Sequence, residues 1–142
     1  MEISFVAGFG PITRDDAARD FWSGGLGIDL GEAAPGYFAT DDLPGVRAFA
    51  LWPLTQAAEA TFGSPEWPED LPVPQAWVEF DVASVEAVAA GAADLTAQGH
   101  RLLRGATTEP WGQTTARLLS PEGLLVGVTF TPWMHGETVL DA

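Results

Sequence analysis

A proline-rich segment divides this sequence into two stretches that predict the same order of secondary-structure elements. Residues 64–75 hold four of the eleven prolines, a composition that favours a semi-extended connection and cannot join a central sheet. On either side, periodicity and turn residues predict a strand, a helix and further strands. A repeated element order indicates an internal duplication. We therefore predict an α+β fold with two βαβββ modules in one chain, at residues 1–63 and 76–134, followed by a tail at 135–142.

Turn residues set the limits of the predicted elements. The first half is predicted to begin with a strand over residues 3–9 that ends at Gly10-Pro11, and Thr13 is predicted to cap the helix that follows. The remaining elements of this half are predicted over residues 37–40 and 46–52 (strands) and 55–62 (a helix ended by Gly63). The second half is predicted to comprise residues 76–82 (strand), 85–98 (a helix capped by Ser84), and 101–106, 114–119 and 124–131 (strands).

The strand that opens the second half alternates strictly between two kinds of side chain. Successive side chains of a strand face opposite sides of the sheet. One side carries Val78, Phe80 and Val82, and the other carries Trp77, Glu79 and Asp81. An indole and two carboxylates on one face of a covered strand indicate a functional surface rather than plain core.

Composition excludes several classes of function. The net charge is −14 and the chain has only six Lys and Arg residues, whereas nucleic-acid binding needs basic clusters. Such a charge attracts cationic ligands, although it serves solubility equally well. The absence of cysteine excludes disulfides and thiolate chemistry. No apolar run has the length of a membrane helix, and the N-terminus lacks a basic secretory region. The expectation is a cytoplasmic protein that binds neither nucleic acid nor membrane.

Three short motifs, together with the paired modules, carry a family resemblance. They are Asp-Phe-Trp-Ser-Gly-Gly-Leu-Gly at residues 20–27, Glu-Pro-Trp-Gly at 109–112 and Ser-Pro-Glu-Gly at 120–123. In this order the chain resembles the vicinal oxygen chelate superfamily, which includes glyoxalase I, ring-cleaving dioxygenases and bleomycin-resistance proteins. The resemblance implies curved half-barrels with outer helices, which enclose a site within one chain or across a homodimer. It also implies that Trp77, Glu79 and Asp81 line the concave side.

Enzymes of this family hold a divalent metal at fixed positions on the first and last strands of each module. Carried over to this sequence, those positions fall on Trp77, Gly127, Phe49 and one of residues 6–8. None of these side chains ligates a divalent ion. His100 and His135 are interpreted as surface residues, so the two-His, one-carboxylate centre of a ring-cleaving dioxygenase is disfavoured. No metal and no cofactor are predicted.

Tryptophans and one carboxylate are the predicted contents of the cavity. Trp77, Trp52 and Trp111 are predicted to stack on a flat or cationic ligand, whereas Trp67 and Trp133 are interpreted as covers of apolar surface. Glu79 is the candidate polar group, as counter-charge or general base, unless Arg117 or Arg47 pairs with it or with Asp81. Asp81 is expected to be solvated. The predicted ligand-binding set is Trp77, Glu79, Phe49, Trp52, Trp111 and Gly127.

Two classes of function follow from this interpretation. The first is a metal-free binding protein of the bleomycin-resistance kind, which sequesters a flat or cationic small molecule such as an antibiotic. The alternative is a lyase or isomerase on the same scaffold, with Glu79 as general base or with a divalent metal whose ligands lie a residue or two from the assigned positions.

Overall fold

The computed structural model describes residues 1–135, so most of the predicted tail lies outside the described residues. One sheet of eight strands runs through the molecule, in the order β2-β3-β4-β1-β5-β8-β7-β6. The elements are β1 (Phe5–Thr13), α1 (Ala17–Arg19), the π-helical turn η1 (Asp20–Gly25), β2 (Gly31–Ala34), β3 (Tyr37–Thr40), β4 (Phe49–Pro53), α2 (Leu54–Phe62), β5 (Ala76–Asp81), α3 (Val85–Ala97), β6 (Arg104–Thr108), β7 (Thr114–Leu119), β8 (Leu125–Phe130) and the 3-10 turn η2 (Pro132–Met134).

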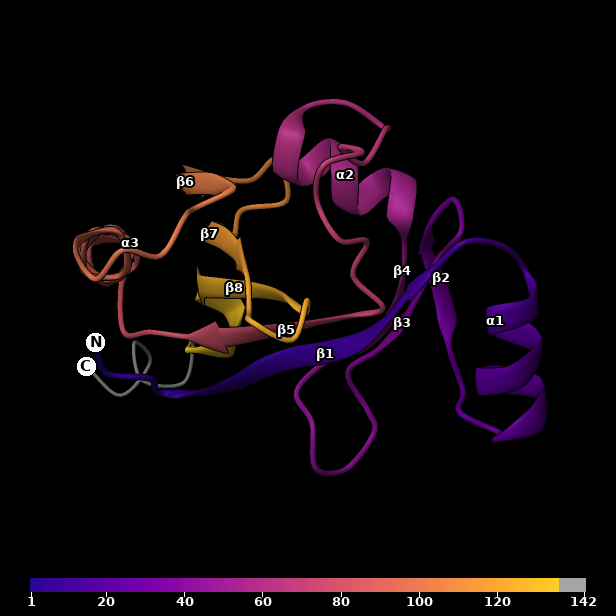
Figure 1. The fold of residues 1–142 in the computed structure, drawn as a ribbon. Coiled ribbons are helices and arrows are strands. Elements are labelled where there is room, and N and C mark those ends of the chain that lie inside the picture. Colours follow the sequence, from indigo (N-terminus) through magenta and orange to yellow (C-terminus); the bar gives the residue numbers. More distant parts are fainter. Residues whose placement is uncertain (136–142) are drawn as a thin grey trace.

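The two halves of the sheet repeat one pattern of strand pairing. β1 is parallel to β4, and β5 is parallel to β8. The halves join through the antiparallel pair β1–β5 at the centre, with α1 and α3 at opposite ends (Figure 1). The predicted α+β class, with a curved mixed sheet and outer helices, is confirmed. The division at residues 64–75 remains a prediction.

Side-chain alternation places a different set of residues on each face of the sheet. On the outer face, Val82 packs with Val88 and Ala92 of α3, as the alternation of β5 predicts. On the inner face, Trp52 and Trp77 pack with Ala57 of α2. Helix α2 therefore closes one side of the concave surface, and the remaining space is available for a site. Among residues 1–135, no helix is long and apolar enough to cross a membrane.

The first half departs from its prediction at both ends of the first helix. β1 does not stop at Gly10-Pro11 but continues to Thr13. Pro11 removes one donor, yet the pairing holds on either side of it, because the N–H of Phe9 donates to Ala48 and that of Ile12 to Gln75. Thr13 belongs to the strand and caps nothing. The residue before the helix is Asp16, whose side chain makes no capping hydrogen bond, while Asp15 accepts the N–H of Ala17 at 3.0 Å.

The end signals of the other helices are confirmed. Gly63 ends α2 with φ 77°, in the left-handed conformation that favours glycine. The Ser84 hydroxyl accepts the N–H of Ala87 at the start of α3. The predicted strand 114–119 is observed with those bounds. β2 has no counterpart among the predicted elements, because its four residues are all exposed and carry no apolar alternation.

Candidate functional site

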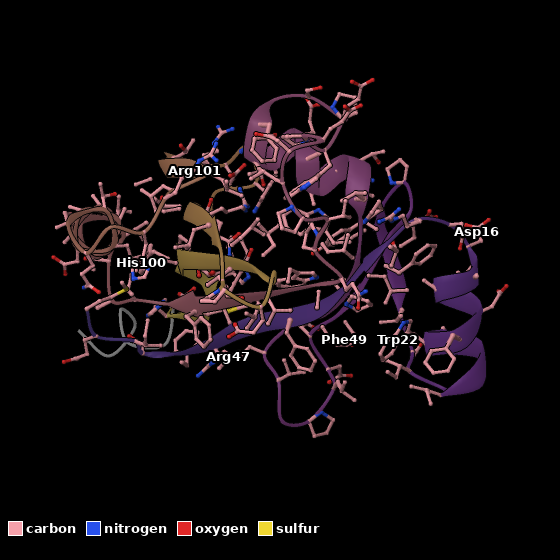
Figure 2. The ribbon with its side chains drawn as sticks, viewed as in Figure 1. Asp16, Trp22, Arg47, Phe49, His100 and Arg101 are labelled. Atoms are coloured by element: carbon pink, nitrogen blue, oxygen red, sulfur yellow. The ribbon has the colours of Figure 1, made fainter. Side chains whose placement is uncertain are left out.

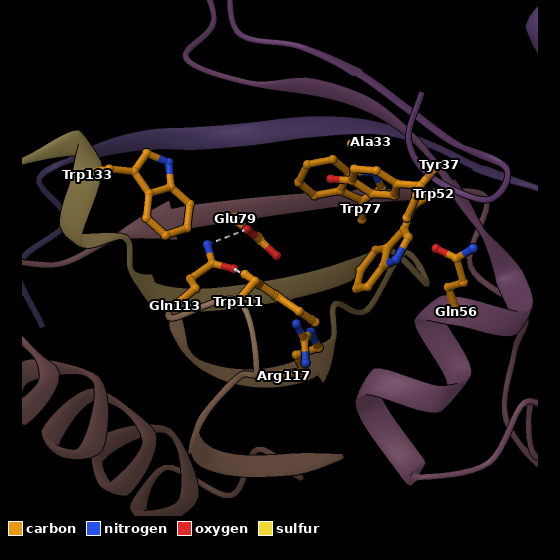
Figure 3. A pocket seen from close by; sticks show the side chains of 11 residues that line it. Ala33, Tyr37, Trp52, Gln56, Trp77, Glu79, Trp111, Gln113, Arg117 and Trp133 are labelled. Carbon is orange, nitrogen blue, oxygen red and sulfur yellow. Dashed lines mark hydrogen bonds between the residues drawn. The ribbon is translucent and has the colours of Figure 1, made fainter. Parts of the chain in front are cut away.

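A cavity of about 380 Å³ lies on the concave side, between the two halves of the chain. Trp133 stands at one end of it and Trp52, Trp77 and Tyr37 at the other, with Glu79, Gln113 and Arg117 between them (Figure 3). The lining residues come from β2, β3, β4, α2, β5, β7, η2 and the turn before β7: Ala33, Ala34, Tyr37, Trp52, Gln56, Trp77, Glu79, Trp111, Gln113, Arg117 and Trp133. The predicted residues Trp52, Trp77, Glu79 and Trp111 are thus brought together.

The indole of Trp77 fills the centre of the concave face. Its Nε1 donates to the carbonyl oxygen of Ala50 at 3.2 Å, and the side chain is 5% exposed. The ring of Trp52 meets it edge-on, with centroids 5.9 Å apart. A Cβ at Gly8 would lie 3.0 Å from the Trp77 ring. A side chain at position 8 would therefore displace the indole, and the glycine makes room for it.

The resemblance implies metal ligands on the first and last strands of each half, and the structure shows which residues of those strands lie beside Trp77 and Glu79 on the concave face. In β1 this residue is Gly8, which lies under Trp77. In β8 it is Gly127, where a Cβ would lie 3.0 Å from Cγ of Glu79. In β4 the inward residue is Ala50, whose carbonyl oxygen accepts the Trp77 N–H. None of these side chains ligates a metal. Within residues 1–135, no three His, Cys, Asp or Glu side chains are grouped as a metal site needs. The residues present do not fit a divalent metal.

The sequence-based assignment of Phe49 to the inward-facing position of β4 is wrong. It is 3% exposed and belongs to a cluster with Phe38 and Leu51 on the outer face. Its ring packs against Trp22 of η1, with centroids 5.6 Å apart, toward the α1 end of the molecule (Figure 2). Phe49 therefore does not line the cavity. Trp22 is half-buried and packs against this cluster.

Glu79 lies in a chain of hydrogen bonds across the cavity. Its Oε1 accepts from Nε2 of Gln113 at 3.0 Å, and the same nitrogen donates to Thr131 at 2.8 Å. The amide oxygen of Gln113 accepts from Nε1 of Trp111 at 3.0 Å. Gln113 therefore fixes both an indole and the carboxyl group. No pattern in the sequence singles out Gln113, because a single glutamine after a turn belongs to no motif and to no periodic pattern.

Burial raises the pKa of Glu79 above its ordinary value of 4.5. The charge of Arg117 and the hydrogen bond from Gln113 act in the opposite direction, and the charges of Asp81 and Glu109 add to the rise. The carboxyl group therefore keeps its proton to a higher pH than an exposed glutamate does. Burial, with the Glu79 charge, also raises the pKa of Tyr37 to about 12, so its phenol is neutral at any ordinary pH.

Arg117 pairs with a carboxylate that the sequence assigns to a turn. Its Nη1 lies 2.8 Å from Oε1 of Glu109, and both side chains are almost fully buried. Thr115 donates to the same oxygen at 3.0 Å. The guanidinium also lies 5.3 Å from the Trp52 ring. The suggested pairing of Arg117 with Glu79 or Asp81 is thus replaced by the pair with Glu109. Arg47 lies over the ring of Phe5 instead, at 4.0 Å.

Asp81 is fully buried, contrary to the expectation that it is solvated. It accepts from the hydroxyl of Thr129, from both the N–H and the hydroxyl of Thr131, and from His135 at 2.6 Å. The imidazole of His135 packs against the rings of Phe5 and Phe130. The interpretation of His135 as a surface residue is therefore wrong.

Three other side chains for which the sequence makes a prediction are found at different places. His100 is exposed, as expected. Trp133, interpreted as a cover of apolar surface, lines the cavity and is 59% exposed at its mouth. Trp133 belongs to η2, which ends at His135, the residue that contacts Asp81. Trp67 packs on Phe62, outside the cavity lining.

Comparisons with known proteins identify the fold. No family model matches the chain, and no curated protein matches it. Solved structures do. A glyoxalase/bleomycin resistance protein/dioxygenase superfamily member from Vibrio splendidus 12B01 is similar at 16% identity, with TM-score 0.55 over 89% of this chain and 97% of that one. A Streptomyces coelicolor methylmalonyl-CoA epimerase, in complex with 2-nitronate-propionyl-CoA, is similar at 17% identity, with TM-score 0.51 over 92% and 99%.

This chain has the vicinal oxygen chelate fold. The resemblance seen in the sequence is thereby confirmed at the level of fold. A structure described as NAD-dependent benzaldehyde dehydrogenase from Legionella pneumophila is also similar, at 14% identity and TM-score 0.58 over 87% of this chain and 96% of that one. Proteins with such different names share the scaffold, so the function of this chain must be argued from its own cavity.

The raised pKa of Glu79 predicts a pH-dependent difference in stability. Below pH 4.5 the carboxyl group is protonated in both the folded and the unfolded chain. As the pH rises above this value, the unfolded chain loses the proton first, so the free energy of unfolding falls until the folded pKa is passed. Glu79→Gln removes this pH-dependent contribution to the free energy of unfolding. Urea unfolding of both proteins between pH 4.5 and 8 is expected to show the variant gaining stability relative to wild type as the pH rises. A difference that is constant with pH contradicts the prediction.

Proposed function

We propose that this chain is a metal-free small-molecule-binding protein that sequesters a flat compound, such as an antibiotic, between indole walls. The observation that carries the proposal is the place of Trp77. On the concave face, where the resemblance implies a metal, this chain has an indole anchored to Ala50 and seated over Gly8. A ring that occupies that place excludes an ion and offers a stacking surface instead.

The size and lining of the cavity support this proposal. A volume of about 380 Å³ falls within the range typical of small-molecule sites, which are mostly apolar with a few placed polar groups. Here four indoles supply the apolar wall, and Glu79, Gln113 and Arg117 supply the polar groups. Of the two ligand types that the sequence suggests, flat and cationic, the flat one is favoured, because burial makes the charged form of Glu79 costly and so raises its pKa.

A second function is favoured by the same carboxyl group. A glutamate whose pKa is raised by burial suits proton transfer, as a lyase or isomerase step requires. In that case Glu79 is the acid–base group, and Gln113 orients it through its Nε2. Turnover that disappears in Glu79→Gln while binding is retained favours this alternative over sequestration.

Binding is tested by titrating the intrinsic tryptophan fluorescence with flat compounds, neutral and cationic, and by mass spectrometry of whatever co-purifies with the chain. Quenching without product formation supports sequestration. Equilibrium dialysis with zinc, nickel, manganese and ferrous ions tests the absence of a metal site, and stoichiometric tight binding of any of them overturns the proposal. We also propose a cytoplasmic location, as composition suggests, and a homodimer, as the resemblance implies; sedimentation equilibrium tests the homodimer.

Loss of one cavity indole is expected to weaken ligand binding. Trp111 is 51% exposed and forms part of the wall, so Trp111→Leu removes a stacking surface with little effect on the core. We expect the affinity for the tightest compound of the panel to fall about five- to tenfold. The matched control is Trp67→Leu, which changes an indole outside the cavity lining and is expected to leave the affinity within about twofold. Equal losses in the two variants contradict the assignment of the cavity.

A further inference from the structure

Arg117 has an unused hydrogen-bond donor in the wall of the cavity. The side chain is 1% exposed, and Nη1 is engaged by Glu109 and, at 3.4 Å, by the carbonyl oxygen of Ala60. Within residues 1–135, Nη2 is buried and has no hydrogen-bond partner. A buried donor without a partner is costly, and native structures rarely keep one without a reason. Arg117 lines the cavity (Figure 3), so a ligand that presses between the wall side chains can supply the missing acceptor.

The surrounding charges determine what kind of acceptor fits. Glu109 already neutralises Arg117 at 2.8 Å, so the pair offers a donor without a net positive charge. The charges of Asp81 and Glu109 act on Glu79, and the chain as a whole carries −14. An anionic ligand group would be repelled by these carboxylates, and a cationic group would face the guanidinium. A neutral oxygen meets neither penalty.

We propose that the ligand of this cavity carries a neutral carbonyl oxygen that accepts a hydrogen bond from Nη2 of Arg117, on a flat frame that lies against the indoles. The inference rests on the proposed function and specifies its ligand class. The apolar frame is held by Trp52 and Trp77, and Trp52 also lies over the guanidinium. The carbonyl fixes the orientation of the frame, because the donor is fixed by Glu109. Aromatic ketones, quinones and planar amides or lactones have this chemistry.

The test uses probes of matched shape. 2-Acetylnaphthalene and 2-isopropenylnaphthalene differ only in the exchange of the carbonyl oxygen for a methylene group. Their dissociation constants are measured at pH 7 by tryptophan fluorescence. We expect the ketone to bind about tenfold more tightly, as a hydrogen bond from a charged donor warrants. 2-Naphthoate and 2-naphthylmethylammonium are expected to bind more weakly than the ketone. Tighter binding of either ion overturns the neutral class.

Variants identify the donor. Because Arg117→Met leaves Glu109 buried and unpaired, the double variant Arg117→Met/Glu109→Gln is used, and its folding is checked by circular dichroism. In this variant we expect the ketone and the alkene to bind about equally. The preference for the ketone is expected to persist in the control Arg101→Met, which changes an exposed arginine. A preference that survives in the double variant shows that the donor is not Arg117 and overturns the inference.

The binding data distinguish failure of the carbonyl inference from failure of the proposed function. If both naphthalenes bind equally to the wild-type chain, the carbonyl inference is wrong, while the aromatic cavity of the proposed function stands. If neither probe binds at millimolar concentration, the proposed function is overturned, and the inference with it.

Discussion

Replacing Arg117 by methionine is expected to lower the free energy of unfolding by about 3–5 kcal/mol. Methionine has a similar stem, so packing against Trp52 is largely kept and the main loss is the charge. That change leaves the carboxylate of Glu109 in a buried site, where, among the donors of residues 1–135, only the hydroxyl of Thr115 still reaches it. A buried charge without its partner is among the few single changes with effects of this size.

A double-mutant cycle separates the pair from its surroundings. Glu109→Gln is expected to be destabilising in the same way, because it leaves the guanidinium unpaired. The double variant is expected to lose much less than the sum of the two single losses, since no buried charge remains. Urea unfolding at pH 7 measures all four proteins, and Arg101→Met controls for the loss of any one arginine. Additive losses would show that Arg117 and Glu109 have no interaction free energy, which would contradict the prediction.

The sequence predicts well what depends on local periodicity. Strict alternation in β5 predicts that Trp77 and Glu79 share the concave face, and the glycine and serine signals predict the ends of α2 and α3. β2 is missed because an edge strand of exposed residues carries no apolar pattern. Thr13 is assigned wrongly because the neighbouring strands β4 and β5 hold β1 extended beyond a proline that locally signals its end.

The metal position on the last strand of each half is predicted four residues after a turn glycine. The structure places that position on the concave face in the second half but not in the first. In the second half, four residues after Gly123 lies Gly127, on the concave face below Glu79. In the first half the same count reaches Phe49, but the residue that faces inward is Ala50. There the chain runs through residues 46–48 before β4 begins, so the spacing is longer by one. Because the side-chain period of a strand is two, an error of one residue transfers a position to the other face.

Buried polar pairs were beyond local prediction. His135 and Asp81 are 54 residues apart in sequence, and each alone reads as a surface residue. Their burial depends on Thr129 and Thr131, whose hydroxyls satisfy the carboxylate. Composition indicates that most carboxylates of so acidic a chain are solvated, and only the tertiary arrangement identifies the exceptions.

Trp77→Ala is expected to lower the free energy of unfolding by about 3–5 kcal/mol, because it removes a buried indole and its bond to Ala50. The space left behind lies between Gly8 and the ring of Trp52 and is lined mainly by apolar atoms. Spaces of this kind bind small aromatic molecules, so millimolar free indole is expected to restore part of the lost stability by binding the folded state alone.

The stability that added indole restores distinguishes a tryptophan ring buried in the molecule from one that lies on its surface. Trp133→Ala provides the matched control, because Trp133 is 59% exposed and its removal leaves no closed space. That variant is expected to lose about 1 kcal/mol or less and to gain nothing from indole beyond the effect on wild type. Thermal and urea unfolding, with and without indole, measure both. If Trp77→Ala is as stable as the control, position 77 does not hold the floor of the cavity, and Trp77 does not occupy the place that the resemblance gives to a metal.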